Sequence, residues 1–468
     1  MEHTFEKSSK AWVLVLASVG SLMAVLDAMV VATSLSTMRA ELGASLEALQ
    51  WTMNAYNLSF AVLLLTGAAL GDRFGRRRMF IAGLALFVLA SVACALAADV
   101  GSLIAARAVQ GAGAAMIMPL AMALLSAAFP PDERGKALGI FSSITGLALI
   151  FGPVAGGAIA EGLSWQWIFW LNLPIGLVII PLAQRRIPES YGPAAVIDVP
   201  GVVLVTGAAL GLVWGLMRGN SIGWISAEVL AALVGGLVLT VAFVLWEQRA
   251  SEPMVRMRFF ASRAFSSGIG ANFLYCAAMY GVVFLLPQFL QFGQSRGPLA
   301  AGLQLLPWTA TLFVVAPIAG KMINQVGERR LVVAGLVLQA VGMAWISLIA
   351  APGLAYLQLV VPFIIMGAGV SMAMPAAQNA VLNAVAGPEV GKAAGVFNMF
   401  RFLGGVSGIA IAGALFAGGG SYGSTQAFSD GFVVALAGSA ALSLVGAFCG
   451  LALPERRAAV FSDVKQKA

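Results

Sequence analysis

Three ionisable side chains lie inside long apolar stretches of this sequence, where charge is costly. Asp27 is the only acid placed well inside such a stretch, and Arg107 and Arg401 are bases placed there. An apolar environment favours the neutral form of a carboxyl group, so Asp27 is suited to bind and release a proton. A buried arginine costs about 2.5–3.5 kcal/mol to insert into a bilayer, which favours a functional role. We therefore predict that Asp27 couples proton binding to the function of the protein and that Arg107 has a functional role as well.

Other reactive residue types are scarce or scattered. The single histidine, His3, lies in a polar N-terminal segment, and Cys94, Cys276 and Cys449 are far apart in apolar runs. This pattern indicates neither a metal site nor a disulfide framework. The sequence contains no phosphate-binding or dinucleotide-binding motif in a fitting context. We expect no metal and no cofactor, with a proton gradient as the energy source.

The elements that must position these residues are membrane-spanning helices. Hydrophobic residues make up 60% of the 468 residues and charged residues 10%, against about 45–50% and 25% in soluble domains. A helix needs roughly 20 apolar residues to cross a bilayer. The sequence predicts spans at 12–32, 50–70, 79–97, 101–124, 137–159, 168–184, 200–217, 228–246, 264–287, 299–319, 331–350, 354–376, 392–416 and 430–453.

The distribution of basic residues orients these spans. With the N-terminus in the cytoplasm, the outer loops keep only Arg39, Arg218 and Arg296 among the 27 Lys and Arg residues, and Arg107 and Arg401 stay inside spans. Cytoplasmic loops of multi-span proteins are enriched in Lys and Arg. The net charge of +7 is thus a topology signal and does not indicate nucleic-acid binding. We predict a multi-pass protein of the cell (inner) membrane with both termini in the cytoplasm.

An internal repeat divides the chain. Residues 111–119 (GAGAAMIMP) recur as 367–375 (GAGVSMAMP), and 135–141 (GKALGIF) recur as 391–397 (GKAAGVF), both 256 residues further on (367 − 111 and 391 − 135). The predicted units are a six-helix bundle at 1–184, a linker with two extra helices at 185–263, a second six-helix bundle at 264–453 and a cytoplasmic tail at 454–468. Parallel repeats of this kind are typical of transporters whose substrate site lies near the midplane.

The loop between the second and third predicted spans carries a motif rich in glycine and arginine. Residues 68–78 (AALGDRFGRRR) resemble the signature loop of the major facilitator superfamily. The resemblance implies a gating role for Gly71, Asp72, Arg73, Gly75, Arg76 and Arg77. Glycine allows a tight turn and close helix approach, and we expect Asp72 to cap a helix start or to pair with a basic residue across the half-domain. A plain stop-transfer loop explains the arginines but not the glycine spacing.

Two further stretches resemble motifs of the same superfamily. Leu103, Arg107, Gln110 and Gly111 are spaced as in its second motif, whose arginine is implicated in proton transfer. The alternative is an arginine held by backbone carbonyls and Gln110 for structure alone. The motif typical of its antiporters is matched by Gly146, Gly152, Pro153, Gly156 and Gly157. Small residues and a proline make a thin, kinked helix, and ordinary close packing is the alternative role.

Residues 26–32 (LDAMVVA) and 165–176 (WQWIFWLNLPIG) resemble stretches of the fourteen-span drug:proton antiporter branch. That resemblance implies an all-α integral membrane protein with a major-facilitator-type fold, in which two inserted helices lie at the periphery of two six-helix bundles. It implies proton-coupled efflux of lipophilic, often cationic, small molecules by alternating access, and no enzyme activity. A dedicated exporter of one metabolite, antibiotic or lipid is the alternative. The Gly152-Pro153 pair tells against a nutrient:proton symporter.

Polar and aromatic residues of the spans are the candidate substrate contacts. They are Asn54, Tyr56, Asn272, Tyr275, Tyr280, Gln288, Trp308, Gln378, Asn379, Phe397, Asn398 and Arg401. Tyrosine and tryptophan in spans are often packing or interface residues instead. We expect proton handling in the first half and a less charged, substrate-contacting wall in the second. The expected partners are small-molecule substrates, protons and the lipid bilayer, with no nucleic acid, and the expected state is a monomer.

Overall fold

The computed structural model describes residues 2–192 and 197–455, and every regular element within these ranges is a helix. The predicted tail at 454–468 lies almost wholly outside the described residues. The α-helices are α1 (Glu2–Leu42), α2 (Leu46–Phe74), α3 (Arg76–Ala95), α4 (Val100–Ala128), α5 (Pro131–Gly162), α6 (Trp167–Trp170), α7 (Asn172–Arg186), α8 (Val199–Ile222), α9 (Ala227–Arg249), α10 (Arg263–Gln288), α11 (Pro298–Gln304), α12 (Leu306–Val326), α13 (Glu328–Ile349), α14 (Leu357–Leu382), α15 (Val390–Gly419) and α16 (Thr425–Leu451). Short helical turns are η1 (Met257–Ala261), η2 (Phe289–Gly293) and η3 (Gly387–Glu389).

The described residues include 14 stretches long and apolar enough to cross a membrane, which confirms the predicted number of spans. The spans predicted at 168–184 and 299–319 correspond to Trp167–Arg186 and Pro298–Ile323. The first span is interrupted at Leu171 between α6 and α7, and the second at Leu305 between α11 and α12. Pro174 and Pro307 follow these breaks, and proline has no N–H to donate to the carbonyl four residues earlier.

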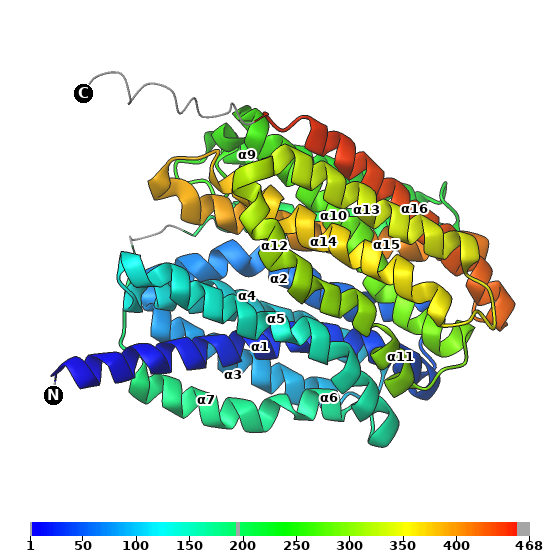
Figure 1. The fold of residues 1–468 in the computed structure, drawn as a ribbon, viewed down its shortest axis with the longest axis horizontal. Coiled ribbons are helices and arrows are strands. Elements are labelled where there is room, and N and C mark those ends of the chain that lie inside the picture. The colour runs from blue at the N-terminus through cyan, green and yellow to red at the C-terminus, as the bar shows by residue number, and fades with distance from the viewer. Residues whose placement is uncertain (1, 193–196, 456–468) are drawn as a thin grey trace.

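Helices α1–α7 and α10–α16 form two bundles of similar design (Figure 1). The repeated glycines on α4 and α14 show the similarity. In the first bundle the α-carbon of Gly111 faces Tyr56 on α2, and Gly113 faces Phe87 on α3; in the second, Gly367 faces Trp308 on α12 and Gly369 faces Gln339 on α13. At each glycine a β-carbon would collide with the neighbouring helix. The sequence repeat is thus a repeat of close helix crossings.

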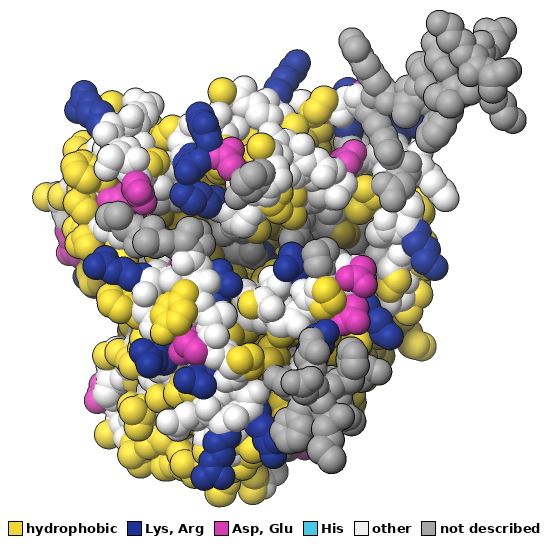
Figure 2. Space-filling model, turned by 90° about the vertical axis from the view of Figure 1, so that its left-hand side faces the viewer, with side chains coloured by type: hydrophobic (Ala, Val, Ile, Leu, Met, Phe, Trp, Pro, Cys, Tyr) yellow, Lys and Arg dark blue, Asp and Glu magenta, His cyan; other side chains and the backbone are white. Residues whose placement is uncertain are grey.

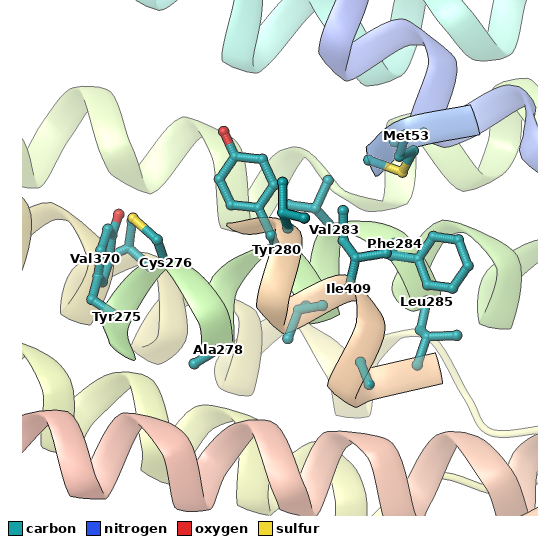
Figure 3. Close-up of a cluster of buried hydrophobic side chains, with 14 of the residues drawn as sticks. Met53, Tyr275, Cys276, Ala278, Tyr280, Val283, Phe284, Leu285, Val370 and Ile409 are labelled. Carbon is teal, nitrogen blue, oxygen red and sulfur yellow. The ribbon is translucent and has the colours of Figure 1, made fainter. Parts of the chain in front are cut away.

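The two bundles meet along a seam between α2 and α15. Gln50 of α2 donates a hydrogen bond to the carbonyl of Ile409 over 2.8 Å, and the rings of Phe60 and Phe402 lie 4.1 Å apart. Figure 3 shows Met53 of α2 directed toward Ile409 and Phe284, which belong to the same buried apolar cluster. The seam is therefore continuous with the core of the second bundle.

A second junction, between α5 and α11, joins the bundles at the end away from the chain termini (Figure 1). Gly157 of α5 packs against Pro298, and Glu161 accepts a hydrogen bond from the amide of Leu299 over 2.9 Å. The other half of α5 lacks such cover, since Ser142 and Ser143 are exposed. The bundles are thus joined at the end with α11 and separated between α5 and α12 at the end where the chain termini lie.

The inserted hairpin of α8 and α9 lies at the periphery, as predicted, but over a specific place. The ring of Trp214 on α8 lies 5.8 Å from that of Trp51 on α2, and Asn220 of α8 donates a hydrogen bond to the carbonyl of Ala414 on α15. Helix α8 therefore contacts one helix of each bundle and covers the α2–α15 seam from outside.

Basic side chains gather at the end of the molecule that carries the termini. Figure 2 views this end and shows Lys and Arg side chains spread over both bundles. The exposed basic residues of the loops and helix ends here include Arg73, Arg78, Arg134, Arg185, Arg258, Lys321, Arg330 and Lys392. The Lys and Arg residues that are concentrated in certain loops of the sequence thus gather at one end of the fold.

Candidate functional site

The first bundle encloses an ion pair between Asp27 of α1 and Arg107 of α4. Both residues are at most 2% exposed. The Nη1 group of Arg107 donates to Asp27 Oδ2 and, over 2.6 Å, to Gln110 Oε1, while Nε donates to the carbonyl of Thr52 over 3.2 Å. The structure therefore brings the two predicted proton-coupling residues into direct contact.

A second layer of amides and one hydroxyl surrounds the carboxylate. Gln110 Nε2 donates to Asp27 Oδ1 and to Ser91 Oγ, each over 2.8 Å. Asn172 Nδ2 donates to Ser91 Oγ over 3.2 Å and lies 3.4 Å from Asp27 Oδ1. Both carboxylate oxygens thus accept hydrogen bonds, an arrangement that stabilises the ionised form.

Helix geometry explains how this cluster assembles. Arg107 and Gln110 are three residues apart on α4 and share one face. Gly111 in the next position admits α2 so closely that the carbonyl of Tyr56 lies where a β-carbon would be. The Tyr56 ring consequently lies under the guanidinium of Arg107, 4.4 Å from its centre, and the Tyr56 hydroxyl donates to the carbonyl of Ala24 over 2.9 Å.

The start of α4 is fixed by a capping box outside the span. Asp99 accepts a hydrogen bond from the amide of Ser102 over 2.9 Å, and Ser102 Oγ lies close to the backbone of Asp99. These backbone and side-chain hydrogen bonds from Ser102 hold the pKa of Asp99 below its usual value. The cap sets where α4 begins, and so where Arg107 lies two turns later.

The cluster has the properties of a proton-dependent link between helices. Two opposite charges in apolar surroundings hold α1 against α4, and protonation of Asp27 would leave Arg107 with only neutral partners. Removing one charge of a buried pair is strongly unfavourable, so such a change would shift the balance between helix arrangements. The alternative is that backbone carbonyls and Gln110 alone hold Arg107. It does not account for the contact between Arg107 and the carboxylate of Asp27.

The glycine- and arginine-rich loop makes a sharp turn between α2 and α3. Gly75 has a φ of 107°, a left-handed value that favours glycine. Asp72 accepts from Arg76 Nε over 2.9 Å, within the same loop. Our expectation that Asp72 caps a helix start or pairs across the half-domain is therefore wrong for this conformation. Glu189 of the following linker occupies the helix start instead, accepting from the amide of Arg77 over 2.8 Å.

The motif typical of antiporters forms the packing surface of α5. Gly152 faces Met29 of α1 and Gly156 faces Thr33, while the backbone of Pro153 faces Gly302 of α11. Together with the contact between Gly157 and Pro298, these glycines place α5 against its own bundle and against the opposite one. Gly146 lies apart from this surface, where a β-carbon would be 3.5 Å from the ring of Phe313 on α12. The other four residues of the motif therefore lie where α5 meets α1 and α11.

The predicted substrate-contacting residues do not form one cluster. Tyr56 belongs to the ion-pair site. The side-chain oxygen of Gln288 accepts a hydrogen bond from the Tyr422 hydroxyl, within the second bundle. Asn379 donates to Glu328 over 2.8 Å at the start of α13. The prediction of a shared cavity is not supported for these three residues, because each is engaged elsewhere.

The remaining candidates lie along the helices that line the seam and the second bundle. Asn54 donates to the carbonyl of Val406 over 3.3 Å, and Asn272 to that of Phe397 over 3.1 Å. Asn398 donates to a carbonyl of its own helix. Trp308 is buried and Gln378 is half-buried. Tyr275, Tyr280 and Arg401 form a group of their own.

Three residues of these sites were absent from the predicted set. Ser91 and Asn172 complete the carboxylate shell, and Glu189 caps α3. Asn172 falls within the stretch 165–176, whose resemblance to antiporters was the one available signal. Ser91 and Glu189 stand outside every motif, and only the fold brings them to their partners.

Comparison with known proteins places the chain in a family. The model of the Major Facilitator Superfamily matches residues 17–311 and 268–467. The chain is 32% identical over 406 residues to multidrug resistance protein Stp of Mycobacterium tuberculosis, covering 86% of this chain and 75% of Stp. It is 32% identical over 420 residues to the tetracenomycin C resistance and export protein of Streptomyces glaucescens, covering 87% and 76%. It is also 32% identical over 447 residues to the methylenomycin A resistance protein of Streptomyces coelicolor, covering 94% and 92%.

Solved structures agree at the level of the fold. The crystal structure of a peptide transporter, POT, in complex with sulfate superposes with a TM-score of 0.71 at 16% identity, covering 94% of each chain. The helix arrangement, the repeated crossings and the sequence relatives lead to one assignment. This chain belongs to the major facilitator superfamily, and so to a family of transporters rather than enzymes.

Proposed function

We propose that this protein exports lipophilic small molecules across the cell membrane in exchange for protons, by alternating access. The observation that carries the proposal is the buried pair of Asp27 and Arg107, because it supplies one protonatable group in direct contact with a fixed charge. The names of the relatives, which include a multidrug resistance protein and a tetracenomycin C export protein, support export as the direction.

The conformation supports alternating access. The bundles are joined at the α5–α11 end and separated at the end rich in Lys and Arg, which we place in the cytoplasm together with both termini. We interpret this conformation as inward-facing. The pairing of Asp27 with Arg107 then fits the state that follows release of a proton to the cytoplasm. Proton entry from outside then gains about 2.3 kcal/mol per 100 mV of membrane potential.

A reconstituted system tests the proposal. Purified protein in proteoliposomes is given an acidic lumen, with the membrane potential clamped by valinomycin and equal potassium, and ethidium is added outside. We expect uptake against its gradient that stops when the pH gradient is dissipated. Asp27→Asn should abolish this uptake, while Asp430→Asn, at the exposed start of α16, should not. Uptake that persists without the gradient, or in Asp27→Asn, contradicts proton coupling.

A dedicated exporter of one compound is the second candidate, favoured by relatives named for single antibiotics. The puromycin resistance protein of Streptomyces alboniger, 34% identical over 406 residues, is one of them. Deletion of the protein from its host separates the two candidates. Sensitivity to several unrelated dyes and antibiotics supports a multidrug exporter, and sensitivity to one compound class supports a dedicated one. We place the protein in the membrane as a monomer.

A further inference from the structure

Arg401 is a second intramembrane arginine that the proton-coupling cluster does not use. It lies on α15, eleven residues after Val390, and so about 16 Å along that helix and near the middle of the span. The ring of Phe402 beside it packs at a tilt against that of Phe60 of α2 at the seam, so Arg401 belongs to the region where the two bundles meet. The side chain is half-buried, which leaves part of it accessible.

The guanidinium of Arg401 has polar neighbours but no acid. Its neighbours include the thiol of Cys276 on α10 and the ring of Phe402, whose centroid lies 5.7 Å away. The ring of Tyr280 on α10 packs against Gly405, one turn further along α15. Its Nε atom is buried and has no hydrogen-bond partner among the described residues. Figure 3 shows Tyr280 projecting from α10 with its hydroxyl directed toward the side where α2 lies.

No helix packed against α15 brings a carboxylate to this depth. In the described part of the chain, α10 and α14 contain no acid at all. The acids of α2, Glu47 and Asp72, stand at its two ends, and Asp430 stands in the first turns of α16. The remaining intramembrane acid, Asp27, is already paired with Arg107 and lies in the other bundle. Arg401 is therefore the one charge of this region whose compensation the described residues do not provide.

An uncompensated guanidinium in apolar surroundings has a strong preference for an anionic partner. Its planar N–H groups suit a carboxylate or a phenolate, which accept two hydrogen bonds at once. The rings of Tyr280, Phe402 and Phe60 supply flat apolar surfaces for the rest of such a molecule. Among the described residues around Arg401 there is no carboxylate that could pair with a cation.

We infer that Arg401 forms the binding site for the acidic group of exported aromatic weak acids, with the ring of Tyr280 nearby on α10. This inference rests on the proposed export function and adds a substrate class to it. Cationic substrates would have to bind beside Arg401 without forming an ion pair. The site lies in the second bundle and the proton site in the first, so substrate and proton occupy separate places.

Two xanthene dyes of opposite charge test the assignment. Fluorescein is the anionic probe and tetramethylrhodamine methyl ester the cationic one, and both are measured after filtration and lysis at a single pH. We expect pH-driven uptake of fluorescein by the wild type. Arg401→Gln should raise the KM for fluorescein by roughly tenfold or more, since a hydrogen bond to a charged group is lost, and leave the KM for the cation unchanged or lower.

Three further variants guard against a merely structural effect. Arg401→Lys keeps the charge and should recover part of the fluorescein affinity, and Arg218→Gln, on α8, removes a charge elsewhere and should change neither KM. Cys276→Ala separates anion binding from pairing with the thiol and should retain fluorescein uptake. An equal loss for both dyes in Arg401→Gln, or loss of fluorescein uptake in Cys276→Ala, overturns the assignment. Wild-type uptake of the cation alone also overturns it, whereas uptake of neither dye contradicts the export function itself.

Discussion

Arg107 on α4 forms an ion pair with Asp27 on α1, 80 residues earlier in the chain, and both side chains are almost completely buried. The pair joins two helices of one bundle at a point where neither partner has access to bulk water. Loss of either member therefore leaves the other as an unpaired charge inside the bundle.

Removal of one partner should destabilise the protein more than removal of both. A lone charge left in the bundle costs about 3–5 kcal/mol, whereas replacing both charges by neutral groups of similar size is close to neutral. We expect Arg107→Gln alone and Asp27→Asn alone each to lower the thermal unfolding temperature in detergent sharply, and the double variant Asp27→Asn/Arg107→Gln to restore most of the loss. Additive losses in this double-mutant cycle would mean that the ion pair does not form.

Asn172→Ala should shift the pH dependence of transport. Asn172 supports the ionised form of Asp27 directly and through Ser91. Without it the carboxylate loses one hydrogen-bond donor, so the pH of half-maximal proton-driven uptake should change. Asn398→Ala is the matched control, because that amide bonds only to a carbonyl of its own helix. A lower maximal rate with an unchanged pH profile would indicate that Asn172 has a packing role only.

A larger side chain at Gly157 should prevent closure of the α5–α11 end. Its β-carbon would meet the carbonyl of Pro298, whereas nothing lies within 4 Å of a β-carbon at Gly162 on the same helix. With a cysteine at the exposed position Ser143, in a background lacking native cysteines, we expect labelling from the cytoplasmic side. Gly157→Leu should reduce that labelling and Gly162→Leu should not. Equal labelling in all three proteins would contradict the gating role of this junction.

Glu389→Gln should destabilise the loop before α15 in a pH-dependent way. Burial alone raises the pKa of Glu389, but the hydrogen bonds and charges of Arg258 and Arg256 outweigh it and hold the pKa below its usual value. A depressed carboxylate pKa stabilises the fold above the unfolded-state value and loses this effect as the pH falls through the folded-state value. The difference in unfolding temperature between wild type and Glu389→Gln should thus be present at pH 7 and shrink toward pH 4. A constant difference would rule out the ion pair as its cause.

The sequence predicts the spans, the repeat and the individual importance of Asp27 and Arg107, because length, hydropathy and motif spacing are local properties. It does not predict that these two side chains meet. A spanning helix that is apolar on all sides gives no periodic signal of which face points inward, so the orientation of each helix is decided by packing. Asn172 is an example. The hydropathy of 168–184 gives no sign that α7 begins at this residue or that its side chain faces Asp27.

The loop motif shows a different limit. Gly75 is recognisable from its spacing, and its left-handed backbone agrees with that prediction. The partner of the helix start is not recognisable, because Glu189 comes from a linker without any pattern and displaces Asp72 from the expected role. Arg401 is visible in the sequence as a charge in a span, but only the three-dimensional arrangement reveals that no acid accompanies it.

Helix α8 lies against Trp51 of α2 and Ala414 of α15 and so separates one long side of the transporter from the surrounding lipid. The opposite side, between α5 and α12, has no such cover near the end with the chain termini. Under the proposed export function, a lipophilic substrate would therefore enter between the bundles from the α5–α12 side. The inserted hairpin makes the two sides of the transporter that face the membrane unequal, although its two bundles are built on the same plan.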